Sequence, residues 1–101
     1  MMKIQFTTAA WNEYLYWQQQ DKKTLKRVNA LLKDIMRGHD EEGAEEGIGK
    51  PEPLKGQGKL AGFWSRRIDA ANRLVYRIIE ERNGDSVYQI LQCKGHYCIF
   101  L

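Results

Sequence analysis

Apolar side chains recur at intervals of three and four along the first third of the chain, the spacing that puts them on one face of an α-helix. One stripe comprises Trp11, Tyr14 and Leu15 with Trp17 beside it, and a second comprises Leu25, Val28, Leu31, Leu32 and Ile35. The aromatic stripe is expected to pack in the core or against a sheet. Thr7 or Thr8 can cap the first helix and Asp21 the second, because their side-chain oxygens accept bonds from the free N–H groups of a first turn. Gly38 is expected to end the second helix.

Beyond residue 60 the pattern changes to short runs rich in β-branched and aromatic residues, which are typical of strands. Residues 62–69, 73–80 and 86–93 form three such runs, and residues 3–6 form another before the first helix. Asn83-Gly84 predicts a tight hairpin turn, and connections this short make the later strands antiparallel. The predicted fold is α+β in the order β-α-α-β-β-β, with an N-terminal strand and a two-helix hairpin packed on an antiparallel sheet.

The chain has 101 residues, of which 43% are hydrophobic, enough for a single domain over residues 1–101 with one core. Residues 38–50 carry glycines and an acidic run and are expected to form a loop, and residues 98–101 an apolar tail. No apolar run approaches the roughly 20 residues that cross a bilayer. The N-terminus turns polar too early for a signal peptide. We therefore expect a cytoplasmic protein with no membrane partner.

The net charge of +3 is unevenly distributed. Residues 1–50 carry eight Lys or Arg and eight Asp or Glu, whereas residues 51–101 carry eight and five. The basic excess falls in the second half, where arginines stand beside aromatic residues. This is a mild indication of an anionic partner and is not sufficient alone.

The two cysteines, Cys93 and Cys98, do not suggest a disulfide or a metal site. Their odd spacing would point them to opposite faces of a straight strand. Only Cys93, His96 and Cys98 cluster, whereas tetrahedral zinc takes about four ligands. We expect buried or half-buried apolar side chains, and no metal or cofactor.

Four features of the second half could carry chemistry. Glu52 lies between Pro51 and Pro53, which hold it on a stiff extended segment. The other three are the pair Arg66-Arg67, Arg73 at the start of a strand, and His96-Tyr97 near the C-terminus.

These are the residue types that RNA cleavage without a metal requires. The 2′-OH must lose a proton as it attacks the adjacent phosphate, the 5′-oxygen should gain one as it leaves, and the phosphate gathers negative charge. A carboxylate, an imidazole and arginines supply those functions, and arginine fits phosphate oxygens in pairs. An aromatic side chain can stack on an unpaired base.

Each residue also has a simpler explanation. Glu52 can be a solvated loop carboxylate, and Arg73 a strand-end ion-pair partner worth about 0–1 kcal/mol. Because strand residues alternate between faces, at least one of Arg66 and Arg67 is expected to face solvent or to pair with Asp69. The His-Tyr pair can be an edge histidine and a core ring. From the residues alone, both interpretations stay open.

Four runs of sequence, taken in order, are similar to those of a known family. They are Trp11 to Gln18 followed by Asp21-Lys22, Gly47 to Gly56, Gly62 to Ile68 followed by Asn72 to Tyr76, and Cys93 to Tyr97. Together they span nearly the whole chain, and the Gly-Lys-Pro-Glu-Pro-Leu and Gly-Phe-Trp-Ser-Arg-Arg-Ile runs are specific. The chain resembles the YoeB/Txe toxins of type II toxin–antitoxin systems, a branch of the RelE-like superfamily.

The resemblance implies a RelE-like fold and a ribosome-dependent endoribonuclease that cuts mRNA without a metal. The implied catalytic residues are Glu52 as general base, His96 as general acid, Arg67 and Arg73 on the phosphate, and Tyr97 for substrate positioning.

The resemblance also implies binding residues and partners. Lys50, Lys55 and Arg66 would contact RNA or the ribosome, although a structural role stays open for Arg66. The implied partners are a YefM/Axe-type antitoxin, the ribosome and mRNA, and a homodimer is compatible with them.

The chain departs from the family in three places. The loop at residues 40–46 is longer and more acidic than usual, residues 57–59 lengthen the next turn, and residues 98–101 extend past the His-Tyr pair. Since acidic groups near a phosphate channel repel RNA, the loop is expected to point into solvent; an altered ribosome or antitoxin contact is the alternative. The tail can pack over a sheet edge, join a dimer or crowd the site.

Two other functions stay open. RelE-like folds include ParE-type proteins that bind DNA gyrase and cleave nothing, and fold alone does not separate the two activities. The acid–base set favours the nuclease. The second alternative is a degenerate toxin that only binds its antitoxin.

Overall fold

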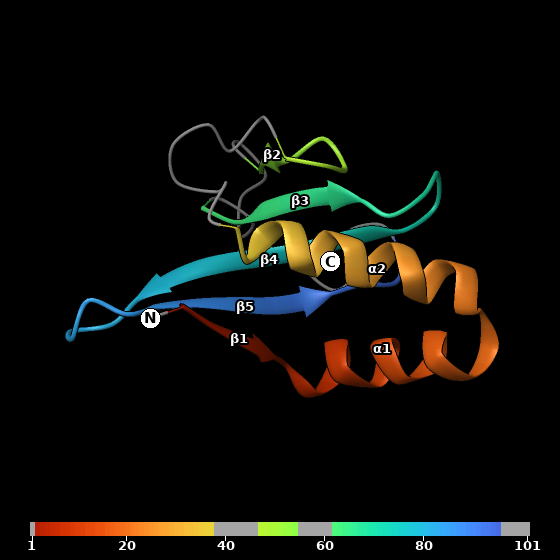
Figure 1. Cartoon of the computed structure of the whole chain (residues 1–101), viewed down its shortest axis with the longest axis horizontal. Helices are drawn as coiled ribbons and strands as arrows, with labels where there is room; N and C mark the ends of the chain where they lie inside the picture. Colours follow the sequence, from red (N-terminus) through yellow and green to blue (C-terminus); the bar gives the residue numbers. More distant parts are fainter. Residues whose placement is uncertain (1, 38–46, 55–61, 96–101) are drawn as a thin grey trace.

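The computed structural model describes residues 2–37, 47–54 and 62–95. In chain order its elements are β1 (Met2–Phe6), α1 (Thr8–Gln20), α2 (Lys22–Ile35), β2 (Glu52–Pro53), β3 (Trp64–Arg67), β4 (Arg73–Glu80) and β5 (Ser86–Gln92) (Figure 1). The predicted α+β fold is confirmed, and β2 is an additional short strand. The predictions for Gly38, for residues 40–46 and for the tail at 98–101 fall outside the described residues.

The strands form one sheet in the order β1-β5-β4-β3-β2. Strands β2 to β5 pair antiparallel, whereas β1 pairs parallel with β5. A parallel pair needs a long crossover, and here the intervening chain holds both helices and the other strands. Figure 1 shows the result, with β1 at one edge of the sheet and β2 at the other.

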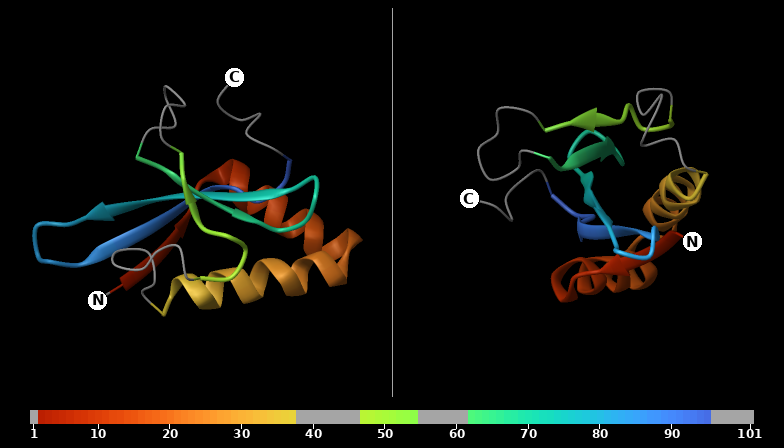
Figure 2. Two further views of the ribbon diagram at one scale, coloured as in Figure 1. Left: turned by 90° about the horizontal axis from the view of Figure 1, so that it is seen from above. Right: turned by 90° about the vertical axis from the view of Figure 1, so that its left-hand side faces the viewer.

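Both helices cover the same side of the curved sheet and run antiparallel, as predicted (Figure 2). Thr7 Oγ1 accepts a bond from the Ala10 N–H at 3.1 Å, and Asp21 Oδ1 accepts one from the Thr24 N–H at 3.1 Å. Both predicted caps are therefore confirmed. No helix in the described part of the chain is long and apolar enough to span a membrane.

The core fills the space between the helices and the sheet. Its fully buried members include Val28, Leu31 and Ile35 of α2, Leu74 and Tyr76 of β4, and Ile90 of β5. Burial of the α2 stripe confirms the apolar pattern from which this helix was predicted. The hairpin turn is also confirmed, since Gly84 adopts φ +87° and the Glu81 N–H donates to Asp85 O at 2.8 Å.

The aromatic stripe of α1 is only partly in the core. Trp17 is buried and its Nε1–H donates to Cys93 O at 2.8 Å. Trp11 remains 45% exposed, and its ring stacks on Tyr14 and meets the edge of Phe6 at the border of the sheet. The stripe therefore packs in the core at Trp17 and against the sheet at Trp11, as expected, and Trp11 stays partly exposed because it contacts β1 at the edge of the sheet.

Candidate active site

Strand register brings Glu52, Arg67 and Arg73 to the same face of the sheet. Glu52 lies directly opposite Ser65, and Arg67 lies directly opposite Arg73. Ser65 and Arg67 are two positions apart on β3, and side chains two apart on a strand project to the same side. We call this side the site face.

The alternate positions on these strands form the helix-covered face. Trp64, Leu74 and Tyr76 pack in the core beneath the helices. The site face is therefore the side of the sheet that points away from α1 and α2 (Figure 2).

Glu52 is exposed on a segment that is anchored on both sides. After it, Leu54 is buried and its N–H donates to Phe63 O at 2.8 Å. Before it, Gly49 O accepts a bond from the Arg67 N–H at 2.6 Å. Gly49 adopts φ +78°, a conformation that glycine accommodates without strain. Glu52 and Pro53 form strand β2, which confirms the extended conformation, and these bonds hold Glu52 beside β3.

Arg73 is half-buried at the start of β4, and its side chain is held by the turn before it. Its Nη1 donates to the carbonyl oxygens of Asp69 at 2.6 Å and of Asn72 at 3.0 Å. Burial acts to raise the pKa of Asp69, but hydrogen bonds from Asn72 and Ala71, together with the Arg73 charge, hold it below its usual value. These bonds hold the Arg73 side chain, and strand pairing places Arg73 directly opposite Arg67.

Arg66 has a structural role. It is fully buried on the helix-covered face, which contradicts the predicted contact with RNA or the ribosome. Its Nη1 donates to Asp34 Oδ2 at 2.5 Å and to Ile48 O at 3.2 Å, and its Nε donates to Tyr76 Oη at 3.1 Å. Because side chains alternate along β3, one of the two adjacent arginines must point toward the helices. Arg66 can be buried there because the Asp34 carboxylate compensates its charge. The carboxylate partner is Asp34 and not Asp69.

Asp34 is a supporting residue that the sequence interpretation missed. It is 3% exposed, and its Oδ2 also accepts a bond from the Ile48 N–H at 3.1 Å. The signal was present, since Asp34 follows Leu31 by three positions and so lies beside the buried stripe of α2, where a carboxylate requires a partner for its charge. Asp34 and Arg66 together hold the loop that leads to Glu52.

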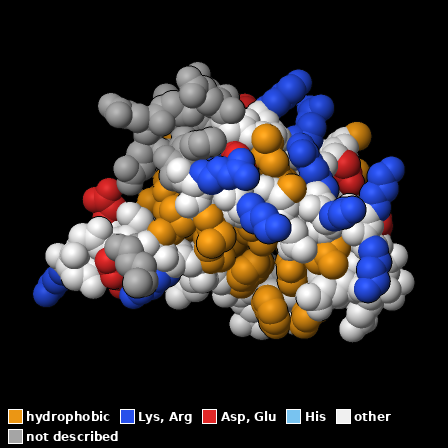
Figure 3. All heavy atoms as spheres, in the orientation of Figure 1, with side chains coloured by type: hydrophobic (Ala, Val, Ile, Leu, Met, Phe, Trp, Pro, Cys, Tyr) orange, Lys and Arg blue, Asp and Glu red, His pale blue; other side chains and the backbone are white. Residues whose placement is uncertain are grey.

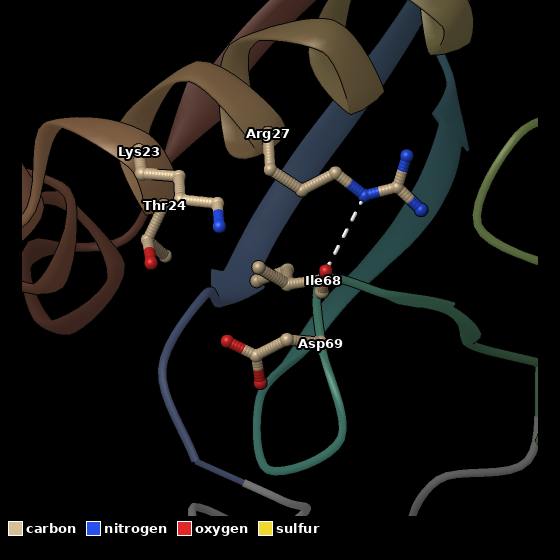
Figure 4. Close-up of a pocket in the computed structure, with 5 residues that line it drawn as sticks. All are labelled: Lys23, Thr24, Arg27, Ile68 and Asp69. Atoms are coloured by element: carbon tan, nitrogen blue, oxygen red, sulfur yellow. Dashed lines mark hydrogen bonds between the residues drawn. The ribbon is translucent and has the colours of Figure 1, made fainter.

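Arg27 is a second support that was not predicted. Its Nη2 donates to Arg67 O at 3.1 Å and its Nε to Ile68 O at 3.3 Å, which ties α2 to the end of β3. Figure 4 shows the bond to Ile68 at the wall of a pocket of about 460 Å³. The lining residues are Lys23, Thr24, Arg27, Ile68 and Asp69.

Basic side chains gather along α2, as Figure 3 shows. We call this the α2 basic surface; its exposed members are Lys22, Lys23, Lys26, Lys33 and Arg37 just past the helix. Lys50, one of the predicted binding residues, is also exposed. The charged stripe arises because α2 buries its apolar side, which leaves its lysines facing solvent.

The predicted roles of His96, Tyr97 and Lys55 concern residues outside the described part of the chain. Gly95, the residue before the His-Tyr pair, lies beside Arg73, however. Gly95 O accepts a bond from the Arg73 N–H at 2.9 Å, and the Gly95 N–H donates to Asn72 Oδ1 at 2.8 Å. The chain therefore passes beside Arg73 just before residue 96.

Cys93 is a buried apolar side chain, as predicted. Burial, with a smaller effect of the Glu13 charge, raises the pKa of the thiol to about 12, so it is protonated at neutral pH. Its N–H donates to Glu13 Oε1 at 2.8 Å, which fixes the end of β5 against α1. Among the residues that the structure describes, no three His, Cys, Asp or Glu side chains lie close enough together to hold a metal ion.

A helical hairpin on one side of a small sheet, with a carboxylate and two arginines on the other, is the arrangement expected of a RelE-like toxin. A family model described as "YoeB-like toxin of bacterial type II toxin-antitoxin system" matches residues 6–97. Toxin YoeB of Synechocystis sp. is 49% identical over 96 residues, which cover 95% of this chain and 98% of that protein.

Solved structures give the same result. The YoeB dimer from Staphylococcus aureus has a TM-score of 0.74 at 45% identity, over 95% of this chain and 98% of that one. The heterotetrameric YoeB-YefM toxin-antitoxin complex from Staphylococcus aureus has a TM-score of 0.68 at 41% identity, over 96% and 99%. The chain belongs to the YoeB-like toxins of bacterial type II toxin–antitoxin systems, which confirms the resemblance found in its sequence.

Proposed function

We propose that this toxin is an endoribonuclease that cuts mRNA on the ribosome without a metal ion. The observation that supports the proposal is the cross-strand pair of Arg67 and Arg73, with Glu52 diagonal to Arg67 at roughly 7–8 Å, within reach of long side chains. Like charges directly opposite each other in a sheet repel. A phosphate bound between the two guanidinium groups converts that repulsion into attraction on both sides.

In the proposed reaction the Glu52 carboxylate takes the proton of the 2′-OH, whose oxygen attacks the adjacent phosphorus. The bond from phosphorus to the 5′-oxygen breaks, and His96 gives that oxygen a proton. One product ends in a 2′,3′-cyclic phosphate and the other begins with a 5′-OH. Arg67 and Arg73 stabilise the charge that gathers on the phosphate oxygens.

Substrate contacts would come from the residues around this centre. Tyr97 stacks on an unpaired base, and Lys50 and Lys55 contact the RNA backbone. Backbone contacts of this kind weaken as salt concentration rises. Because the substrate is mRNA on a ribosome, the toxin acts in the cytoplasm.

The test is primer extension on mRNA in a reconstituted translation reaction. It compares the wild type with Glu52→Ala and Arg73→Ala, after circular dichroism has verified that both variants fold. We expect wild-type cuts within ribosome-occupied codons and a loss of those cuts in both variants.

The other outcomes separate the alternatives. Cuts that persist in both variants would keep the nuclease and overturn the residue assignment. An absence of cuts from the folded wild type would reject the nuclease. Inhibition of gyrase supercoiling would then support a ParE-type function, and normal growth of cells expressing the toxin alone would support a protein that only binds its antitoxin.

We also propose a YefM-type antitoxin as the protein partner, because the Staphylococcus aureus relative forms a heterotetrameric complex with YefM. A dimer of this chain is compatible with the YoeB dimer of the same species. The α2 basic surface suits an acidic partner segment that folds on binding. Calorimetric titration should show an affinity that falls with added salt, and salt-insensitive binding would count against this contact surface.

A further inference from the structure

Gln92 is a fully buried polar side chain in β5. It is 0% exposed, and within the described part of the chain neither Oε1 nor Nε2 has a hydrogen-bond partner. An amide left unpaired away from water costs free energy on folding, so such groups are rare and require an explanation. Gln89 on the same strand shows the ordinary arrangement, because its amide bonds Arg77 at 2.8 Å and Gln5 at 2.7 Å.

A bulge in β5 turns Gln92 toward the site face. Ile90 lies opposite Tyr76 and packs beneath the helices, whereas Gln92 lies opposite Val75. Moving from Ile90 to Gln92 advances β5 by two residues, whereas moving from Tyr76 to Val75 advances β4 by only one. Without this bulge, Gln92 would lie on the helix-covered face with Ile90. The next residue, Cys93, packs against α1 again. The extra residue thus re-aims one side chain without disturbing the core.

Gln92 is a neighbour of the proposed phosphate site. Val75 is two positions from Arg73 on β4, so Gln92 and Arg73 are diagonal neighbours across the strands, roughly 7–8 Å apart. A phosphate held between Arg67 and Arg73 brings the sugar and base of its own nucleotide into this region.

We infer that Gln92 hydrogen-bonds the base of the nucleotide whose phosphate Arg67 and Arg73 hold, and so sets a sequence preference; the inference rests on the proposed nuclease function. An amide carries a donor beside an acceptor and pairs with a base edge that offers the complementary pair, as adenine does. Such a pairing would give both polar atoms of the amide the partners that they lack among the described residues. Because Gln92 lost its water on folding, pairing costs it no further desolvation, and a base that cannot pair gains nothing.

The test uses the same substitution at two glutamines of β5. Gln92→Met keeps the approximate shape and removes both polar atoms where they are unpaired; Gln89→Met removes them where they are bonded. For each variant we would measure the melting temperature and map cuts by primer extension on an mRNA that contains all sense codons.

Gln92→Met is expected to raise the melting temperature, since the folded protein no longer buries an unpaired amide. Its cuts at the codons that the wild type prefers should fall about 5- to 150-fold relative to other codons. Gln89→Met should lower the melting temperature and keep the wild-type pattern of cuts.

A wild-type codon pattern in Gln92→Met would overturn the inference, whatever the melting temperature. An equal loss of cleavage at all codons would overturn it as well, because the amide would then not distinguish one base from another. If the wild type cuts nothing, the proposed function fails and the inference fails with it. Cutting by the wild type therefore separates the two failures.

Discussion

The two faces of the sheet use neighbouring arginines in opposite ways. Arg66 is buried on the helix-covered face and bonds the Asp34 carboxylate, whereas Arg67 is exposed on the site face with Arg73 directly opposite. A buried guanidinium with a carboxylate partner holds the fold together. An arginine that lies opposite another arginine across two strands is repelled by it and is available to an anionic ligand. The charge of an arginine therefore says little about its role until the face on which it lies is known.

The two faces are also connected. Asp34 and Arg66 bond the N–H and the carbonyl of Ile48, in the loop that leads to Glu52. The Arg67 N–H bonds Gly49 O in the same loop. The helix-covered face thus fixes the course of the chain that presents the carboxylate on the site face.

The largest change in stability is expected from the helix-covered face. Leu31 is fully buried in α2, and Leu31→Ala should lower the free energy of unfolding by about 2–5 kcal/mol because it leaves a cavity. Met36 is 57% exposed just past the same helix, so Met36→Ala should stay within about 0.5 kcal/mol. Urea unfolding measures both. Equal stability of the two variants would contradict the division between the faces.

A smaller loss of stability, accompanied by a loss of cleavage, is expected from a substitution at Gly47. A Cβ at this position would lie 2.6 Å from Asp34 Oδ2 and 2.8 Å from Arg66 Nη1. Gly47→Ala should therefore cost about 1–3 kcal/mol and also reduce cleavage per folded molecule, because the displaced loop carries Glu52.

Gly84→Ala is the matched control for this effect. Gly84 lies in the hairpin turn with φ +87°, so an alanine strains the backbone there without touching the site. It should lower stability and leave cleavage per folded molecule unchanged. If Gly47→Ala behaves in the same way, the loop does not link the two faces.

The smallest effect is expected from acid. Burial acts to raise the pKa of Asp69, but hydrogen bonds led by Asn72 outweigh it and hold the pKa below the usual value of about 3.9. The stability that this carboxylate contributes is therefore fully present above that value and is lost as pH falls through the lower folded pKa. Between pH 7 and about pH 3, the melting temperature should fall less steeply in Asp69→Asn than in the wild type. If the melting temperatures of the variant and the wild type fall in parallel, the Asp69 carboxylate does not stabilise this turn.

Local features of the fold could be predicted from the sequence, whereas long-range ones could not. The caps at Thr7 and Asp21 and the turn at Gly84 depend on residues a few positions away, and all three are confirmed. The parallel pairing of β1 and the strand character of β2 depend on distant partners. Trp11 shows the same limit, since its exposure depends on where α1 crosses the edge of the sheet.

The candidate site also combines features that the sequence predicts with features that depend on long-range contacts. Sequence runs identified Glu52, Arg67 and Arg73, but their common face follows only from the register of β2, β3 and β4. Alternation required one of the two adjacent arginines to point inward, and the choice depended on Asp34, a residue 32 positions from Arg66. The bulge that turns Gln92 leaves no mark in the residue pattern.

The most direct test measures Arg66→Ala and Arg67→Ala side by side, by urea unfolding and by primer extension on translated mRNA. Arg66→Ala should lose about 3–5 kcal/mol of stability, because it leaves Asp34 buried without its partner. Arg67→Ala should stay within about 0.5 kcal/mol of the wild type and lose roughly 10²- to 10³-fold in cleavage. Equal destabilisation of the two variants, or full cleavage by Arg67→Ala, would contradict the assignment of the fold to one face and of RNA cleavage to the other.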